Sequence, residues 1–178
     1  MNEETRRLIL RRPRLEDVPS LFEFMGDPNA MRHTHADASM QACRRRVAVH
    51  EWRRRRDGCA PWTIVSKHNQ EIIGWGGLYD DPFDPGWGVE VAYLFRPSAW
   101  GNGFATELVM HCLGVAASVL KLPEVKAFTH PENVGSRHVL EKAGFEVVHF
   151  LPDMNRHLFR RALHGAEHTD GPSNQHLV

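Results

Sequence analysis

The stretch RPSAWGNGFATEL (residues 96–108) is the most informative part of the chain, because a glycine turn there joins a strand-like run to a long apolar helix. Gly101 and Gly103 allow the backbone to curl so that successive N–H groups converge on one point. The N-terminus of the following helix adds roughly half a positive charge. A phosphate or diphosphate group is the ligand that such a turn binds through main-chain amides.

Hydrophobic periodicity predicts an α+β fold around this turn. Strands are expected over residues 8–11, 60–66, 71–79, 88–95, 125–129, 145–151 and 157–163, and helices over 15–25, 39–57, 104–120 and 134–143. This order indicates one central mixed, mostly antiparallel β-sheet flanked by helices. It excludes a Rossmann fold, since no G-x-G-x-x-G lies near the N-terminus, and no G-K-[ST] for a triphosphate is present.

The apolar faces of two helices are also predicted. On the helix over 39–57 we expect Met40, Cys43, Val47 and Trp52 to face a core. On the helix over 104–120 the apolar face is formed by Leu108, Val109, Cys112, Val115, Ala116 and Val119.

Composition predicts a single cytoplasmic domain. The chain has 178 residues and is 42% hydrophobic, which suits one core over residues 1–164 with a polar C-terminal tail over 165–178. Acidic and basic side chains balance at 22 each, so no global field attracts nucleic acid or an anionic membrane. Three widely spaced cysteines without a C-x-x-C pair indicate neither a disulfide framework nor a zinc site. No apolar segment approaches the roughly 20 residues of a membrane span.

Two segments resemble motifs of the GNAT acetyltransferase superfamily. Residues 100–105, WGNGFA, resemble its pyrophosphate-binding segment R/Q-x-x-G-x-G/A, and residues 133–145, NVGSRHVLEKAGF, resemble the N-x-x-S…E-K-x-G-F helix that follows. The closer match is the RimJ/RimL-like branch of ribosomal-protein N-terminal acetyltransferases, which shares the opening Leu8–Arg11 and the segment DPNAM at 27–31. The resemblance covers Arg6 to Leu163. Trp100 occupies the R/Q position, so backbone amides must bind the diphosphate.

The resemblance implies acetyl-CoA as co-substrate and no metal. Its diphosphate is expected on the loop amides and its pantetheine arm against the strand edge. The implied cofactor-binding residues are Tyr93, Leu94, Phe95, Trp100, Gly101, Asn102, Gly103, Phe104, Ala105, Thr106 and Asn133. Asn133 is also a good helix N-cap, and both roles are compatible.

Acetyl transfer to an amine needs a base, an oxyanion donor and a proton for the leaving thiolate. The resemblance implies Glu90 as the base; the alternative is that Glu90 is a solvent-side residue of an alternating strand. It also implies an oxyanion donor at a bulged N–H near Tyr93 or Leu94. Many family members use a tyrosine in the helix after the N-x-x-S motif as the general acid. Leu140 stands at that position here, which leaves Ser136 or solvent as the proton donor.

The function favoured is direct acetyl transfer in a ternary complex to a primary amine, either a protein N-terminus or a small molecule. One alternative is the same fold with another acyl group or acceptor, and another is a non-catalytic acyl-CoA-binding regulatory module. A third is an RNA-associated protein that uses the arginines at 44–46 and 53–56, although a solvated face with internal ion pairs is favoured there. Monomer and homodimer both remain open.

His33 and His35 resemble a pair of metal ligands only superficially, because no third ligand has supporting spacing. In the family their segment borders the acceptor pocket, so contact with substrate is the preferred role.

Overall fold

The computed structural model describes residues 2–163, so the predicted tail at 165–178 lies outside the described residues. The strands are β1 (Glu3–Glu4), β2 (Leu8–Arg11), β3 (Trp62–Ser66), β4 (Ile72–Asp80), β5 (Val89–Phe95), β6 (Glu124–Thr129), β7 (Glu146–Leu151) and β8 (Arg156–Ala162). The helices are α1 (Val18–Met25), α2 (Met40–Asp57), α3 (Phe104–Ser118) and α4 (Val134–Lys142), with short 3-10 turns at Leu15–Asp17, Pro97–Ala99 and Pro152–Met154. Every predicted helix and strand is present, and β1 is an addition.

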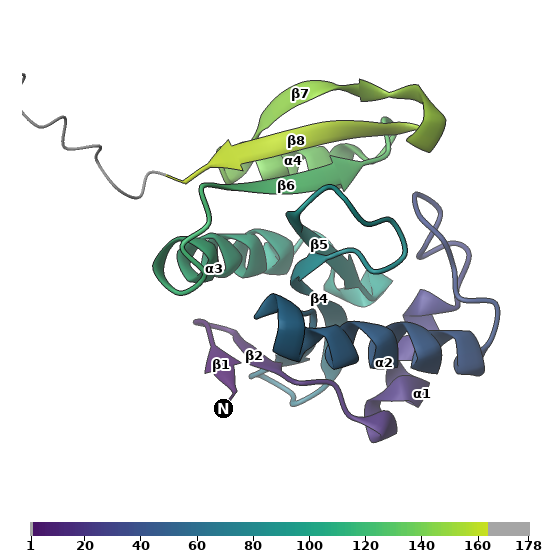
Figure 1. Ribbon diagram of the computed structural model, residues 1–178. Helices are drawn as coiled ribbons and strands as arrows, with labels where there is room; N and C mark the ends of the chain where they lie inside the picture. The colour runs from purple at the N-terminus through teal and green to yellow at the C-terminus, as the bar shows by residue number, and fades with distance from the viewer. Residues whose placement is uncertain (1, 164–178) are drawn as a thin grey trace, which may run out of the picture.

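The strands form one sheet in the order β1-β2-β3-β4-β5-β6-β8-β7 (Figure 1). All neighbouring strands of this sheet are antiparallel except β5 and β6, which run parallel and are joined by α3. The predicted mixed, mostly antiparallel α+β sheet is therefore confirmed. Within residues 2–163 no helix combines the length and the apolar character that crossing a membrane requires.

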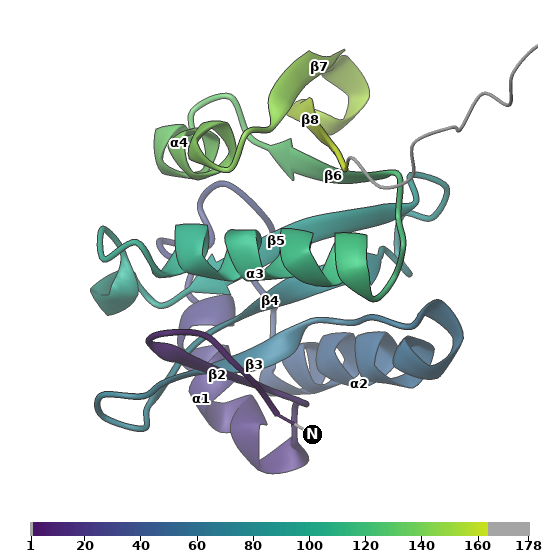
Figure 2. The ribbon, with the colours of Figure 1, turned by 90° about the vertical axis from the view of Figure 1, so that its left-hand side faces the viewer.

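The helices cover both faces of the sheet (Figure 2). On one face α3 and α4 pack on the strands through a large cluster that includes Leu108, Leu140 and Phe159. On the other face α1 and α2 pack around Trp75 through a smaller cluster that includes Phe24. Because side chains alternate along a strand, successive residues of β5 face different helix pairs.

Glycines in β4 let β5 approach closely. A Cβ on Gly76 would lie 2.5 Å from the Ala92 carbonyl oxygen, and one on Gly74 would lie 2.7 Å from the Phe95 ring. This close approach fixes β5, the strand that leads into the glycine turn, against the centre of the sheet.

The buried stripe of α2 differs from the prediction. Met40 and Trp52 are 48% and 77% exposed, whereas Cys43, Val47 and His50 are buried. Met40 begins the helix, and Trp52 follows His50 by two positions, which is about 200° around the helix axis. Val119, also predicted to face the core, lies just beyond the last residue of α3 and is 70% exposed.

Ion pairs within α2 agree with the interpretation of its arginines as internally paired. Arg53 pairs with Asp57 at 3.1 Å, and Arg54 pairs with Glu51 at 2.7 Å. The helix begins at Ser39, whose hydroxyl accepts the Ala42 N–H, and ends at Gly58 in the left-handed conformation.

Candidate functional site

A cavity of about 620 Å³ opens where β5 and β6 meet the N-terminal ends of α3 and α4. The α1–α2 loop contributes its third wall through Ala30–Thr34. Of the residues predicted from sequence, the cavity is lined by Tyr93, Leu94, Phe95, Trp100, Gly101, Gly103, Phe104, Ala105, Thr106, Asn133 and Ser136. Asn102 and Glu90 are the two that do not line it.

The glycine turn forms an open cradle at the start of α3. Gly101 and Gly103 have φ values of 73° and 76°, in the left-handed region that glycine adopts without strain. Gly103 is the N-cap of α3, and no side chain caps the helix there. The first-turn N–H groups therefore face the cavity mouth without a side-chain acceptor, which suits an anionic ligand.

Two guanidinium groups from elsewhere in the chain reach this turn. Arg7 lies with its guanidinium 4.6 Å from the centre of the Phe104 ring and donates to the Asn102 carbonyl at 2.8 Å. Arg32 lies 5.3 Å from the centre of the Trp100 ring. Arg7 is paired with Glu107 at 2.7 Å, so Arg32 is the group of the two that adds positive charge beside Trp100.

The strands β5 and β6 diverge beside the turn. Their pairing is recorded only at Glu90 and Lys126, although β5 continues to Phe95 and β6 continues to Thr129. On its other side β5 pairs with β4 in one continuous register, so the predicted bulge near Tyr93 or Leu94 is absent. Instead of a bulge, the divergence of β6 leaves the edge of β5 unpaired beside the turn.

The register identifies which N–H of β5 faces that edge. The Arg96 N–H donates to the Ile73 carbonyl of the β4 side at 3.0 Å. Alternate residues of an antiparallel strand send their N–H groups to the same neighbour, so Leu94 donates toward β4 and Tyr93 donates toward β6. The Tyr93 N–H therefore points at the cleft, and the Leu94 N–H does not.

The side chain of Tyr93 also reaches across the cleft. Its hydroxyl lies 3.0 Å from Ser136 Oγ and donates to the Ser136 carbonyl at 3.3 Å. Burial raises the pKa of Tyr93 to about 12. A neutral phenol is thereby held against the first turn of α4, whereas Leu140, at the family's tyrosine position, is buried in the core.

Asn133 caps α4. Its side-chain oxygen accepts the Ser136 N–H at 3.1 Å, so the predicted N-cap role is confirmed. The same residue lines the cavity.

Glu90 is 6% exposed, so the alternative that it is a solvent-side residue is wrong. Burial raises its pKa to about 8, with further increases from Asp81 and Asp84 and a decrease from the Tyr79 hydroxyl. Glu90 lies where β5 still pairs with β6, short of the cavity wall.

The structure brings His130 and Glu132 to His33, where sequence spacing offered no third ligand. The potential ligand atoms of these three residues lie within 4.8 Å of one another. The rings of His33 and His130 stack at 5.4 Å between centroids. His35 is exposed and does not line the cavity.

Comparison with known proteins gives the family. Residues 7–146 match the family model described as an acetyltransferase (GNAT) domain. The chain belongs to the GNAT acetyltransferase family.

Its relatives agree with this membership. An uncharacterized N-acetyltransferase, p20, of Bacillus licheniformis is 26% identical over 159 residues, which are 85% of this chain and 86% of that protein. The acetyltransferase from Agrobacterium tumefaciens str. C58 has the same fold, with a TM-score of 0.80, 23% identity and coverage of 90% of this chain and 94% of that one. A RimL ribosomal L7/L12 alpha-N-protein acetyltransferase in complex with coenzyme A has a TM-score of 0.72, 15% identity and coverage of 89% and 96%. The chain is therefore an N-acetyltransferase.

Several groups of this GNAT site were not predicted. Arg7 and Arg32 at the cradle, and His130 and Arg156 on the cavity wall, come from segments without a local motif. Only tertiary contacts reveal them. The expectation that the segment between the first two helices borders a pocket does agree with Ala30–Thr34 on the cavity wall.

Proposed function

We propose that this enzyme transfers an acetyl group directly from acetyl-CoA to a primary amine within a ternary complex. The observation that carries the proposal is the continuity of one cavity from the glycine cradle to the diverging strands β5 and β6. Such a cavity accepts a diphosphate at one end and an extended thioester arm along an unpaired strand edge. The RimL protein in complex with coenzyme A supports the choice of this co-substrate.

Direct transfer is supported by the state of the cysteines. Cys43, Cys59 and Cys112 are buried, and none of them lines the cavity. Burial raises the pKa of Cys43 to about 12 and that of Cys59 to about 11. No thiolate is therefore placed to carry the acetyl group between donor and acceptor.

The RimJ/RimL-like branch is part of the proposal. The segment DPNAM at 27–31 begins the loop that forms the third wall of the cavity. Trp100 stands at the R/Q position of the motif, where the RimJ/RimL-like branch that the chain resembles usually has an aromatic residue. Acetylation of peptide N-termini and small amines, measured as thiol release from acetyl-CoA, tests the activity. Saturable CoA binding without transfer to any amine would instead support a non-catalytic module.

In the proposed mechanism, the amides of residues 101–106 and the amide of Asn133 bind the co-substrate. The Tyr93 N–H stabilises the oxyanion that develops on the thioester carbonyl, because it points into the cleft without a strand partner. Glu90 removes the amine proton through water. The Tyr93 hydroxyl, supported by Ser136, protonates the departing thiolate.

Removal of the Tyr93 hydroxyl should slow the reaction. We expect Tyr93→Phe to lower kcat by about 100-fold, since general acids typically contribute 100-fold or more. The dissociation constant of CoA should change by less than about threefold, because the ring and the backbone N–H remain. Steady-state kinetics and CoA titration measure the two quantities.

Ser136→Ala separates support from proton donation. It keeps the Tyr93 phenol and the Ser136 carbonyl, so we expect a loss in kcat of roughly tenfold or less. A Tyr93→Phe enzyme with the kcat of the unaltered protein would contradict the role of Tyr93 and leave solvent as the proton donor.

The pH dependence should report Glu90. Because its pKa is about 8, Glu90 is protonated at lower pH, and the rate should rise through that region. In Glu90→Gln we expect kcat/KM to fall most above about pH 8, by roughly 100-fold, and the variant profile to follow the titration of the acceptor amine alone. Profiles of both proteins with one amine give the ratio at each pH.

Stability provides an independent readout for Glu90. A carboxyl with a raised pKa in the folded state stabilises the protein below its ordinary value, and this contribution is lost as the pH rises through about 8. Glu90→Gln removes that loss, so the melting temperature of the variant should decline less from acidic to alkaline pH than that of the unaltered protein. An unchanged decline together with unchanged kcat/KM would exclude Glu90 as the base.

A further inference from the structure

Four cationic or protonatable side chains line one part of the cavity, beside the glycine turn that Arg32 reaches. Arg32 and His33 come from the α1–α2 loop, His130 follows β6, and Arg156 begins β8. All four line the cavity. We name them the mouth cluster.

The mouth cluster is connected across these segments. Arg32 Nε donates to His33 Nε2 at 3.2 Å, and the His33 ring stacks on His130. His130 Nε2 lies 3.0 Å from the side-chain Nδ2 of Asn155, and the backbone carbonyl of Asn155 accepts from Arg156 Nη1 at 3.0 Å. The loop between α1 and α2 and the turn before β8 thus meet at one small surface.

The mouth cluster has an excess of positive charge. Within residues 2–163 no carboxylate lies within ion-pair distance of Arg32 or Arg156, whereas arginines of α2, α4 and β8 pair with carboxylates. Burial lowers the pKa of Arg156, and burial followed by Arg32 and His130 lowers the pKa of His33. Glu132 is exposed. Its charge acts to raise the pKa of His33, but this effect is smaller than the lowering by burial, Arg32 and His130.

An anion fits this environment better than a metal ion does. Although His33, His130 and Glu132 have ligand atoms within 4.8 Å of one another, two guanidinium groups adjoin them and repel a cation. Three of the four ring nitrogens are also engaged, because His130 Nδ1 accepts the Glu132 N–H at 3.2 Å, His130 Nε2 contacts Asn155 and His33 Nε2 accepts from Arg32. A carboxylate or phosphate instead matches the donors that the arginines offer.

We propose that the mouth cluster binds an anionic group of the acceptor, so that the preferred acceptor is an amine with a carboxylate or phosphate near its amino group. This inference rests on the proposed acetyl transfer. It favours amino acids and peptides with an acidic residue next to the N-terminus, and it disfavours polycationic amines such as aminoglycosides.

Pairs of acceptors that differ by one negative charge test the proposal, with each KM expressed as the concentration of unprotonated amine. One arm compares alanine with alaninamide, and the other compares Ala-Asp-Ala-amide with Ala-Asn-Ala-amide. We expect a KM for the charged member that is lower by about 10- to 100-fold in at least one arm, as one or two hydrogen bonds to a charged group provide. The arm that shows it identifies a free α-carboxylate or an acidic side chain.

Variants connect that preference to the mouth cluster. In Arg156→Gln the two members of an acceptor pair should have nearly equal KM values. Arg160→Gln is the matched control, because Arg160 is exposed on the same strand and lies 3.9 Å from Glu124; there the ratio should persist. The dissociation constant of CoA should stay within about threefold of the unaltered protein in both variants.

Four results would overturn the inference. Equal KM values within both pairs, with transfer proceeding, would remove the anionic acceptor but leave the proposed function intact. If Arg156→Gln weakened CoA binding by the same factor by which it reduced the KM ratio of an acceptor pair, the mouth cluster would be assigned to the phosphates of the co-substrate. Stoichiometric Zn²⁺ binding that His130→Gln abolishes would make it a cation site. If none of the tested amines gave thiol release from acetyl-CoA, the acceptor inference and the proposed function would both be overturned.

Discussion

Gly103→Val should weaken CoA binding by roughly 100- to 10,000-fold. Gly103 has a φ of 76°, which a β-branched residue adopts only with strain, so the turn must change shape. Hydrogen bonds from neutral donors to charged groups are worth about 1.5–3 kcal/mol each, and loss of two of them gives this range. The effect requires no lost charge, because Trp100 already replaces the charged residue of the motif. Titration of CoA by calorimetry measures the affinity.

Gly114→Val is the matched control for that experiment. Gly114 is exposed on α3, and a Cβ there would meet nothing within 4 Å. Its φ carries no left-handed requirement, so the same substitution should leave CoA affinity and the melting temperature nearly unchanged. A folded Gly103→Val protein that keeps the CoA affinity of the unaltered chain would contradict the assignment of the cradle.

The parts of the site that sequence predicted are those with local signals. Gly101 and Gly103 mark the turn because their conformation excludes other residues, and Asn133 marks a helix start because its side chain caps the next turn. These signals depend on neighbours within about four residues. The positions of the strands along the chain likewise follow from short-range periodicity, and the structure confirms them.

The parts that sequence missed depend on contacts between distant segments. Tyr93 reaches Ser136 across 43 positions in the chain, and Arg7 reaches Asn102 across 95. The burial of Glu90 depends on how β4, β5 and β6 pair, and strand alternation alone suggested that it faces solvent. No spacing rule encodes such contacts, so the proposed proton donor and the mouth cluster emerge only in the folded chain.

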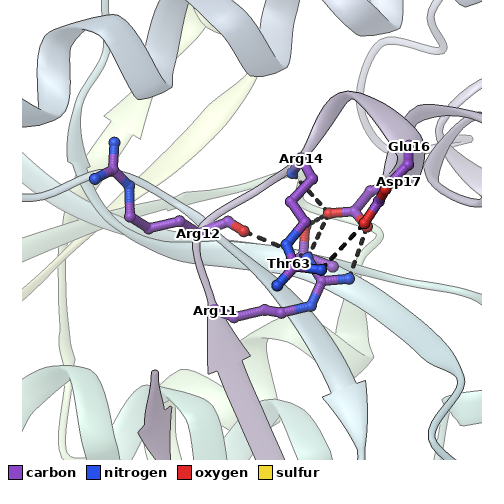
Figure 3. A network of polar contacts seen from close by, with 6 residues as sticks. All are labelled: Arg11, Arg12, Arg14, Glu16, Asp17 and Thr63. Atoms are coloured by element: carbon purple, nitrogen blue, oxygen red, sulfur yellow. Dashed lines mark hydrogen bonds and ion pairs between the residues drawn. The ribbon is translucent and has the colours of Figure 1, made fainter. Parts of the chain in front are cut away.

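The expected effect of Asp17→Ala is a loss of about 3–5 kcal/mol in the free energy of unfolding. Figure 3 shows Asp17 between Arg11, the backbone of Arg14 and Thr63. The Asp17 carboxylate accepts from Arg11 at 2.6 and 2.7 Å, from the Arg14 N–H at 2.8 Å and from the Thr63 hydroxyl at 2.9 Å. Removal of one partner from a buried ion pair leaves the other charge without compensation, which gives that magnitude.

The pH dependence of this contribution has a defined sign. Burial alone would raise the pKa of Asp17, but hydrogen bonds from Arg11, Arg14 and Thr63 outweigh it and hold the pKa below its ordinary value. The stabilisation is therefore present above the ordinary value and is lost as the pH falls through the folded-state pKa. Chemical denaturation at neutral and acidic pH should show the difference between Asp17→Ala and the unaltered protein narrowing in acid.

Two further variants decide whether the buried charge is the cause. Glu16→Ala removes an exposed carboxylate whose partner Arg14 lies 3.1 Å away, and exposed pairs contribute about 0–1 kcal/mol. In the double variant Arg11→Met with Asp17→Ala the uncompensated guanidinium is gone, so the protein should be at least as stable as Asp17→Ala alone. A double variant clearly less stable than Asp17→Ala would mean that the two losses add, and the network would then stabilise the start of α1 through packing and not through the ion pair.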